Sequence, residues 1–416
     1  MKSPVWHPFT QHGLGEPIPL VERSEGAAFY TSDGRRIIDA ISSWWVTTHG
    51  HRHPRIMDAI ARESGRLDQV MFAGWTHEPA EELAHQLLAL VGGDLDYVFY
   101  SDSGSTSVEV ALKMALGYWR NLGITRDRIV VLEGSYHGDT IGGMSVGARG
   151  VFNRAYLPLL FDVDVIPFPE QGREERTIDA LEQLCREGAP AALIVEPLIL
   201  GAGGMRIYSA ETLRALRSVC AVHGVLFIAD EVMTGWGRTG TLLACEQAGI
   251  APDLLCLSKG LTGGALPLAV TLATAAIYNA HRSPDRSRMF FHSSSYTANP
   301  IACAAALGNL AVWREEPVHE RISALGRRQE RRLQRLQGHA QAKNIRRIGT
   351  IAALEIGEEP SNYLSRRAPA LLAHFVRTGV QLRPLGNTIY VMPPYCIEEP
   401  DLDLIYDSIE EALEQF

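Results

Sequence analysis

The middle of this 416-residue chain alternates short, fully apolar runs with amphipathic stretches. The apolar runs, which we expect to be strands, are Tyr97–Tyr100, Ile129–Leu132, Ala191–Val195, Val225–Ala229, Leu254–Leu257 and Leu268–Leu272. Between them lie helical patterns at Ser107–Leu122, Ile178–Arg186 and Ala210–His223. Strands that lack a polar face and are separated by helices indicate a mostly parallel sheet with helices on both faces. We therefore predict an α/β protein.

The two ends of the chain have a different pattern. Residues 1–50 contain hairpin-like pieces, with Ala28–Tyr30 and Arg36–Ile41 on either side of a Ser-Asp-Gly turn. After Glu316 we expect a long basic helix, a strand at Ile351–Ile356, another helix, two short strands and a last helix at Asp401–Glu414. This pattern predicts a large α/β domain at 51–315 and a smaller α+β domain built from 1–50 and 316–416.

Charge and composition argue against several classes of function. The chain has 39 Lys+Arg and 48 Asp+Glu, and a net charge of −9 disfavours a nucleic-acid or anionic-membrane binder. The basic run Arg321–Arg335 is therefore expected to be a solvated helix face. Apolar stretches are too short for a membrane span, and the first residues do not look like a secretory leader. The six scattered cysteines fit a reducing cytoplasm.

Two polar residues follow neighbouring predicted strands. Lys259 comes just after the run that ends at Leu257, at the sheet edge where open α/β folds place their sites. Partial burial there would favour the neutral amine that a Schiff base needs, although many such lysines only reach solvent. Asp230 closes the preceding apolar run. It could pair with an arginine or with the protonated nitrogen of a pyridine ring.

A third element, Ser101–Glu109, follows a strand and opens a helix. Gly104, Ser105 and Thr106 would offer backbone N–H groups and hydroxyls to a phosphate at the positive end of that helix. Thr106 and Glu109 have the spacing of a capping box, and an ordinary capped turn would explain the same residues. The segment matches neither the dinucleotide-binding glycine pattern nor the P-loop, which disfavours those ligands.

Taken together, these elements resemble the class III (ω) aminotransferases, which are pyridoxal phosphate enzymes of fold-type I. The segments that carry the resemblance are Gly104–Thr106, Tyr136–Asp139, Glu196–Pro197, Asp230–Val232, Gly235–Gly240 and Ser258–Gly260. The resemblance implies a large domain with a mostly parallel seven-stranded sheet, a small second domain and a homodimer.

The resemblance also implies a role for each cofactor-binding residue. Lys259 would form a Schiff base with pyridoxal phosphate and then move the proton, Asp230 would hold the ring nitrogen, and Tyr136 would stack on the ring. The phosphate would be held by Ser103, Gly104 and Ser105 and by two residues of the neighbouring subunit, Ser294 and Ser295. The segment Ser293–Tyr296 replaces the Gly-Pro-Thr-Phe that is usual in the family.

Within the family, the chain is similar to members that convert 8-amino-7-oxononanoate to 7,8-diaminononanoate in biotin biosynthesis. Trp6–Phe9, Ser42–Trp45 and Arg383–Tyr395 carry this similarity. It implies that Arg383 binds the substrate carboxylate, while Trp44 and Trp45 wall the channel for its methylene chain. The other implied substrate contacts are Phe9, Tyr136, Arg238, Ser293 and Tyr390.

The sequence leaves the substrates partly open. Phe9 and Leu200 stand where related chains usually have Tyr and Gln, so the amino donor is either S-adenosylmethionine or lysine. The same cofactor residues would also serve another ω-aminotransferase, for 4-aminobutyrate, ornithine or a diamine, or an aminomutase. His49, His51 and His53 alternate along the chain, but the neighbouring Gly and Pro favour a loop near the site over a metal centre.

Overall fold

The computed structural model describes residues 3–357 and 367–416. Its centre is a seven-stranded sheet, whose strands lie in the order β4 (Leu95–Ser101), β12 (Ala269–Thr274), β11 (Leu254–Leu257), β10 (Leu226–Asp230), β7 (Ala192–Val195), β5 (Ile129–Leu132) and β6 (Asp164–Ile166). β12 is antiparallel to β4 and β11, whereas the other neighbours are parallel. The predicted mostly parallel sheet is therefore confirmed. Strand β6 was missed, because it is three residues long and begins with an aspartate.

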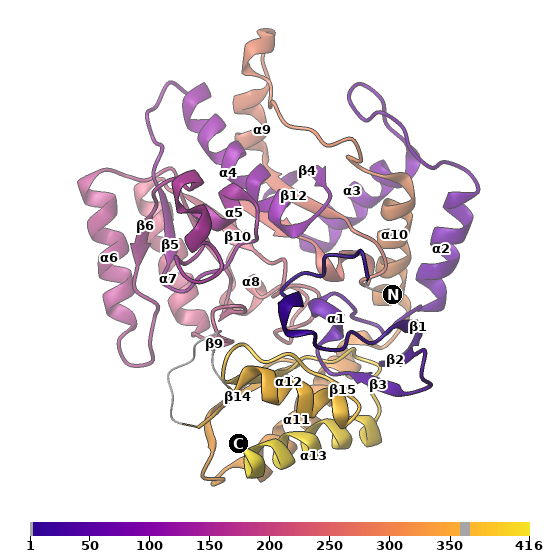
Figure 1. Cartoon of the computed structure of the whole chain (residues 1–416). Coiled ribbons are helices and arrows are strands. Elements are labelled where there is room, and N and C mark those ends of the chain that lie inside the picture. Colours follow the sequence, from indigo (N-terminus) through magenta and orange to yellow (C-terminus); the bar gives the residue numbers. More distant parts are fainter. Residues whose placement is uncertain (1–2, 358–366) are drawn as a thin grey trace.

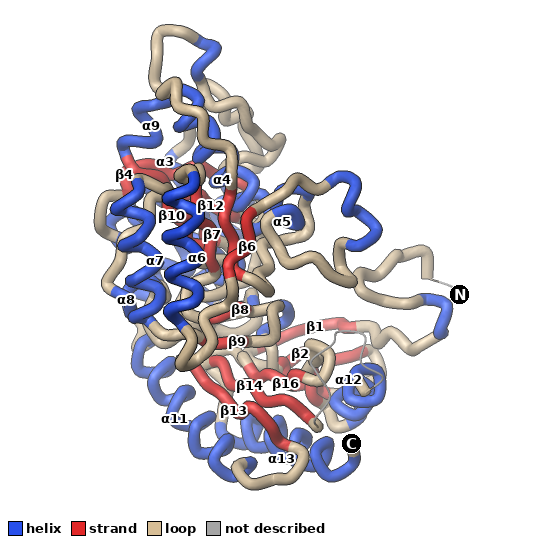
Figure 2. Tube along the Cα trace, turned by 90° about the vertical axis from the view of Figure 1, so that its left-hand side faces the viewer, coloured by secondary structure: helices blue, strands red, loops and turns tan. Residues whose placement is uncertain are grey.

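Helices cover both faces of this sheet, as Figures 1 and 2 show. Alternate residues of each strand pack on opposite faces of the sheet. Val131 and Ile194 belong to the same apolar cluster as helix α4 (Gly104–Asn121). Val130 and Leu193 belong to the cluster that contains α6 (Glu174–Glu187) and α7 (Ala210–His223). The remaining helices around the sheet are α2 (Pro54–Ser64), α3 (Glu78–Val91), α5 (Ile141–Ser145), α8 (Cys245–Ala248), α9 (Ala275–His281) and α10 (Pro300–Glu315).

The N-terminal and C-terminal segments of the chain both lie below the central sheet in Figure 1, although the two termini themselves are well apart. One sheet has the order β1 (Val21–Glu25), β2 (Ala28–Thr31), β3 (Arg36–Asp39) and β15 (Val380–Gln381). A second contains β13 (Ala342–Ile348), β14 (Ile351–Ile356) and β16 (Thr388–Val391), and a small ribbon pairs β8 (Ile199–Leu200) with β9 (Arg206–Ile207). The parallel pairing of β15 with β3 joins the C-terminal segment to the N-terminal hairpin. The domain boundaries themselves stay a prediction.

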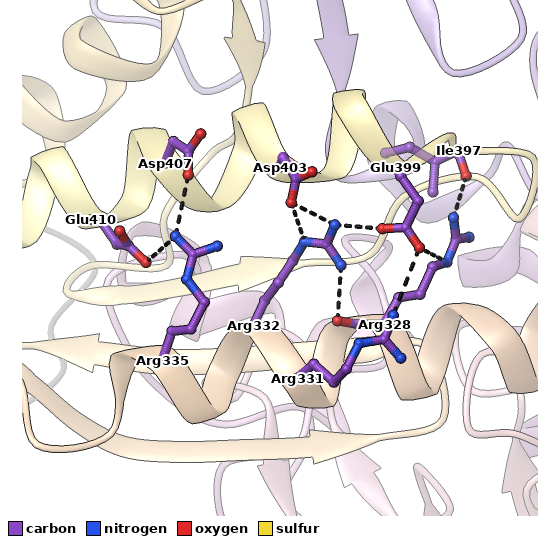
Figure 3. A network of polar contacts seen from close by, with 9 residues as sticks. All are labelled: Arg328, Arg331, Arg332, Arg335, Ile397, Glu399, Asp403, Asp407 and Glu410. Atoms are coloured by element: carbon purple, nitrogen blue, oxygen red, sulfur yellow. Dashed lines mark hydrogen bonds and ion pairs between the residues drawn. The ribbon is translucent and has the colours of Figure 1, made fainter.

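The basic run is the predicted solvated face only in part. The Arg331 and Arg335 side chains are 63% and 49% exposed, whereas Arg332 is buried. The run lies in α11 (Val318–Leu336), which packs beside α13 (Glu399–Gln415) through ion pairs (Figure 3). The Arg332 side chain is only 7% exposed, donates to Asp403 at 2.6 Å and also contacts Glu399. The other members of this network are Arg328, Arg331, Arg335, Asp407 and Glu410. The sequence could not show that an acidic helix some 70 residues later supplies the counter-charges.

The remaining α-helices are α1 (Ser42–Trp45) and α12 (Ala368–Arg377). The described chain also contains four short 3-10 helices. All six cysteines are free, and five of them are buried. None of the helices described here is long and apolar enough to cross a membrane.

Candidate active site

The carboxyl ends of two neighbouring strands place Lys259 and Asp230 on one cavity. Asp230 ends β10 and lies opposite Cys256 of β11, and Lys259 opens the 3-10 helix η3 (Lys259–Thr262) just after β11. The cavity measures about 140 Å³. It is lined by Trp45, Ser103, Gly104, Ser105, Tyr136, His137, Gly138, Glu196, Asp230, Val232, Met233 and Lys259. The structure thus brings six predicted cofactor-binding residues and Trp45 together.

Lys259 has an amine that is easier to deprotonate than an ordinary lysine. Its Nζ lies 4.5 Å from the centre of the Trp45 ring. Burial lowers the pKa of Lys259 to about 8, against the opposing charges of Asp230 and Glu196, and the charge of Arg238 lowers it further. With this pKa, roughly a tenth of Lys259 is a free amine at pH 7, against less than about a thousandth of an ordinary lysine, and the free amine is the form that a nucleophile requires.

Asp230 is paired with a histidine, not with the arginine that the sequence offered as an alternative. Its Oδ2 lies 2.7 Å from Nδ1 of His137, and its Oδ1 accepts from the backbone N–H of Val232 at 3.1 Å. Because a carboxylate only accepts, Nδ1 of His137 is the donor. Both residues are buried. The carboxylate is thus fixed in orientation while it faces the cavity.

The start of α4 forms the third wall, with a cap different from the predicted one. Ser103 caps the helix and forms a capping box with Thr106. The predicted Thr106–Glu109 box is wrong, because the helix starts at Gly104, and Glu109 instead accepts from the N–H of Gly142 at 2.6 Å. A Cβ at Gly104 would lie 2.5 Å from the Val232 side chain, so a larger residue would clash with Val232 unless one of the two moved. The helix start can bind an anion.

Glu196 is a buried acid to which the sequence analysis gave no role. It follows β7, and its two oxygens accept from the backbone N–H groups of Tyr136 at 3.0 Å and Gly201 at 2.9 Å. Burial raises the pKa of Glu196 to about 7. The reasoning used for Asp230, an acid directly after an apolar strand, would have found it. His137 lies five residues after the end of β5, so the same reasoning would not have found it.

A packed layer lies behind Trp45. The indole N–H of Trp45 donates to the Tyr390 hydroxyl at 3.0 Å. Arg238 is buried and donates to the carbonyls of Pro393 and Thr47, each at 3.1 Å. Of these predicted substrate residues, only Trp45 lines the cavity. Arg238 supports the backbone beside Trp45, and its charge acts on Lys259 from behind.

The remaining predicted substrate residues lie farther out. Phe9 and Trp44 are exposed, and their ring centres are 5.4 Å apart. Arg383 donates to the Phe9 carbonyl at 2.9 Å, and its guanidinium lies 5.9 Å from the Trp44 ring. A second cavity, of about 460 Å³, shares Tyr136 and Gly138 with the first and is also lined by Arg149, Phe152 and Arg206. A larger space thus adjoins the cavity that contains the lysine.

The serine segment 293–295 is outside the cavity of this chain. The Ser294 hydroxyl donates to Asp102, Ser293 donates to the Ser294 carbonyl at 3.3 Å, and Ser295 is exposed. Leu200 is buried in β8.

The three alternating histidines contact separate partners. His51 lies 2.8 Å from Asp39, and His53 lies 3.2 Å from Glu316. His49 is buried and packs edge-on against Trp313 and Tyr395. Within residues 3–357 and 367–416, no group of three or more His, Cys, Asp and Glu is arranged to hold a metal ion.

Comparisons with known proteins agree along the whole chain. The family model "Aminotransferase class-III" matches residues 10–413. The chain is 44% identical to adenosylmethionine-8-amino-7-oxononanoate aminotransferase of Synechococcus elongatus, over 99% of this chain and 98% of the relative. It is 36% identical to the enzyme of the same name from Aquifex aeolicus, over 100% and 96% of the two chains.

Solved structures give the same result. The crystal structure of adenosylmethionine-8-amino-7-oxononanoate aminotransferase from Methanocaldococcus jannaschii superposes with a TM-score of 0.94 at 31% identity, covering 99% of this chain and 97% of that one. An amine transaminase from an uncultivated Pseudomonas species, in its PLP-bound form, also superposes with a TM-score of 0.94, at 32% identity and over 100% and 99% of the chains.

Proposed function

Because the chain belongs to the class III aminotransferase family, we propose that it converts 8-amino-7-oxononanoate to 7,8-diaminononanoate, a step of biotin biosynthesis. The family match confirms the predictions of a fold-type I chain, of a transaminase and of pyridoxal phosphate as its cofactor. The observation that carries the substrate is the full-length similarity to several chains named for 8-amino-7-oxononanoate. The proposed amino donor is S-adenosylmethionine, with lysine as the alternative.

The cavity fits pyridoxal phosphate chemically. It joins a reactive amine on Lys259, a carboxylate on Asp230 and a donor-rich helix start at Ser103–Ser105, which would hold the aldehyde, the ring nitrogen and the phosphate. Tyr136 would lie on the face of the ring. When bound, the cofactor supplies an electron sink for the carbon that loses its proton.

The protein's own groups would orient the reactants and move the proton. Lys259 would hold the cofactor covalently and, once displaced by the donor, would carry the proton through its free amine, for which a pKa of about 8 is suited. The contact of Asp230 with His137 would keep the carboxylate oriented to hold the ring nitrogen. Trp45 and Met233 would exclude water from the same space.

We propose that the substrate extends from the cavity of Lys259 toward the larger adjoining one. The Phe9 ring lies 6.0 Å from the ring of Phe152 in the larger cavity, whereas Trp44 and Arg383 do not line it. We propose that Arg383 binds the substrate carboxylate and that Trp44 and Trp45 flank the methylene chain, with Phe9 and Tyr390 at the edges. Arg383 already lies beside Phe9 and Trp44, which supports this placement. Arg238 and Ser293 stay predicted contacts, and the bonds of Arg238 to backbone carbonyls favour an indirect role.

We also propose that the working unit is a cytoplasmic homodimer. Ser294 and Ser295 lie outside the cavity of their own chain, and Ser295 is exposed. A second copy could therefore bring these hydroxyls to the phosphate site. Dimer formation in solution would be checked by sedimentation, and complementation between Lys259→Ala and Ser295→Ala chains would test the shared site.

The decisive experiment is a mass-spectrometric assay for 7,8-diaminononanoate. The purified chain is incubated with pyridoxal phosphate, 8-amino-7-oxononanoate and either S-adenosylmethionine or lysine, in separate reactions. Product with one donor supports the proposal and identifies the donor. Product with neither donor, together with turnover of 4-aminobutyrate, ornithine or a diamine, would assign the chain to another activity of the family.

A further inference from the structure

We propose that Asn309, on helix α10, is a positioning residue for Lys259, and that its side-chain amide clamps the two backbone carbonyls that follow the lysine. This inference rests on the proposed function, because it concerns the lysine that would hold the cofactor. Asn309 does not line the cavity, and it belongs to none of the motifs identified in the sequence.

The backbone of Lys259 needs support from outside its own segment. Its φ of 46° lies in the left-handed region, which residues with a side chain rarely adopt. The helix η3 that it opens is four residues long. Its backbone bonds include Leu261 N–H to Ser258 at 2.9 Å and Gly263 N–H to Gly260 at 3.0 Å. The hydrogen bonds of a short 3-10 turn have poorer geometry than those of an α-helix, so contacts from outside the turn would help to hold a strained residue.

Asn309 supplies that support. It is completely buried, and its Nδ2 donates to the carbonyl of Gly260 at 3.1 Å and to that of Leu261 at 3.0 Å. Carbonyl oxygens only accept, so the amide must turn its NH₂ group toward both of them. On the other side, Gly260 packs so tightly that a Cβ would lie 2.7 Å from Trp236. The segment after Lys259 is therefore held from two directions.

The helix that carries Asn309 is itself firmly seated. α10 spans 16 residues and is capped by Asn299, whose side chain accepts from the N–H of Ala302. It approaches α2 closely, because a Cβ at Gly308 would lie only 3.1 Å from both Ala59 Cβ and the Arg55 carbonyl. Close helix contact of this kind leaves little room for the amide to move.

His49 lies behind Asn309 and places no charge next to its hydrogen bonds to Gly260 and Leu261. Burial lowers the pKa of His49 to about 3, against an opposing contact with Asn309. The imidazole is therefore neutral at any pH used for an assay. The support that Asn309 gives to Lys259 does not depend on pH, so a change in the titration of Lys259 reports the position of the lysine.

The test replaces Asn309 and follows the pH profile of Lys259. Apoprotein is mixed with pyridoxal phosphate, and the rate of covalent capture is followed by absorbance between pH 6 and 10. In Asn309→Leu, which keeps the volume and removes both donors, we expect capture at neutral pH to fall about tenfold. The midpoint of the profile should also rise from about 8 toward the ordinary lysine value, because the relaxed lysine leaves its desolvated place.

Two further variants make the result decisive. Leu310→Ala removes buried volume at the next position of the same helix and should leave the midpoint unchanged. An unchanged midpoint in Asn309→Leu, or an equal shift in Leu310→Ala, would overturn the inference. If Asn309→Leu does not fold, Asn309→Ala, which also removes both donors and adds no charge, decides by the same criteria. A wild-type chain that captures no pyridoxal phosphate would overturn the proposed function instead.

Discussion

The two halves of the candidate site are built in different ways. The inner half (Lys259, Asp230, His137 and Glu196) comes from strand ends and a loop beside them, and its acids and histidine are buried with fixed partners. The outer half (Phe9, Trp44 and Arg383) comes from the two chain ends, and two of its members are exposed. The inner half is therefore preorganised within one chain, whereas the outer half borders open space that a substrate or a second copy would fill.

The backbone between the two halves is also different. Ser42, Ser43 and Trp45 all have positive φ, a conformation that residues with side chains rarely adopt. This segment places Trp45 inside and leaves Trp44 outside. Strain at the boundary, next to a cavity, fits a part of the molecule that was shaped for binding at a cost in stability. The two halves should accordingly respond differently to substitution.

Lys259→Ala should have the largest effect, because it removes the one amine in the inner half. We expect the formation of 7,8-diaminononanoate, measured by mass spectrometry, to fall at least about a thousandfold. Lys113→Ala is the control, since Lys113 lies outside the cavity and donates to the Phe291 carbonyl. Full turnover by Lys259→Ala would contradict the assignment of the inner half.

Arg383→Ala should separate the outer half from the inner one. Loss of a charge-assisted contact with the substrate carboxylate should raise KM for the keto acid about ten- to hundredfold. Cofactor capture should not change. Arg36→Ala, which breaks an ion pair with Asp401 away from the cavity, is the control. Equal effects on the keto acid and on the amino donor would count against the assigned role of Arg383.

His137→Phe tests whether the inner half depends on a fixed carboxylate. Without the donor at 2.7 Å, Asp230 loses a partner, and cofactor affinity measured by equilibrium dialysis should fall about tenfold. His374→Phe replaces another buried histidine, which contacts the Ser408 carbonyl, and controls for general destabilisation. Unchanged affinity in His137→Phe would mean that Asp230 is oriented by its strand alone.

Local sequence pattern indicated two residues of the inner half, whereas the outer residues were indicated only by the resemblance to a family. Asp230 and Lys259 follow apolar strands, and parallel neighbours bring strand ends to one sheet edge, so local pattern was sufficient. Glu196 gave a similar signal but is assigned no role, and His137 lies beyond the reach of that pattern, five residues after β5. The pairing of β15 with β3 and the place of Arg383 beside Phe9 join residues more than 300 positions apart. Periodicity holds no information on such contacts.

The same limit explains the errors. The burial of Arg332 within the otherwise exposed basic run could not be predicted, because its partners Glu399 and Asp403 lie in α13, beyond the range of any helical pattern. The capping box was misplaced by one turn, since Ser103 and Thr106 satisfy the helix start as well as Thr106 and Glu109 would. The role of Asn309 could not be predicted from the sequence, because an asparagine in an apolar helix does not indicate which groups its side chain contacts.

Glu196→Gln should have the smallest effect of these substitutions. It tests how the charge of Glu196 changes the pKa of Lys259 in the inner half. The charge of Glu196 raises the pKa of Lys259, so its removal should shift the midpoint of cofactor capture below about 8, by roughly half a unit to one unit. The free amine is the reactive form, and Glu196→Gln should therefore capture faster than the wild type at pH 7.5.

The direction of this shift in the midpoint can be checked within the same experiment. Because the pKa of Glu196 is about 7, the wild-type carboxylate is largely protonated at pH 6, and the two profiles should converge there. Glu63→Gln, which replaces a buried glutamate of α2 outside the cavity, should follow the wild type at every pH. A midpoint that rises in Glu196→Gln would contradict this prediction. It would mean that weaker hydrogen bonds to Tyr136 and Gly201 let the inner half relax, and that the loss of burial then raises the pKa of Lys259 by more than the lost charge of Glu196 lowers it.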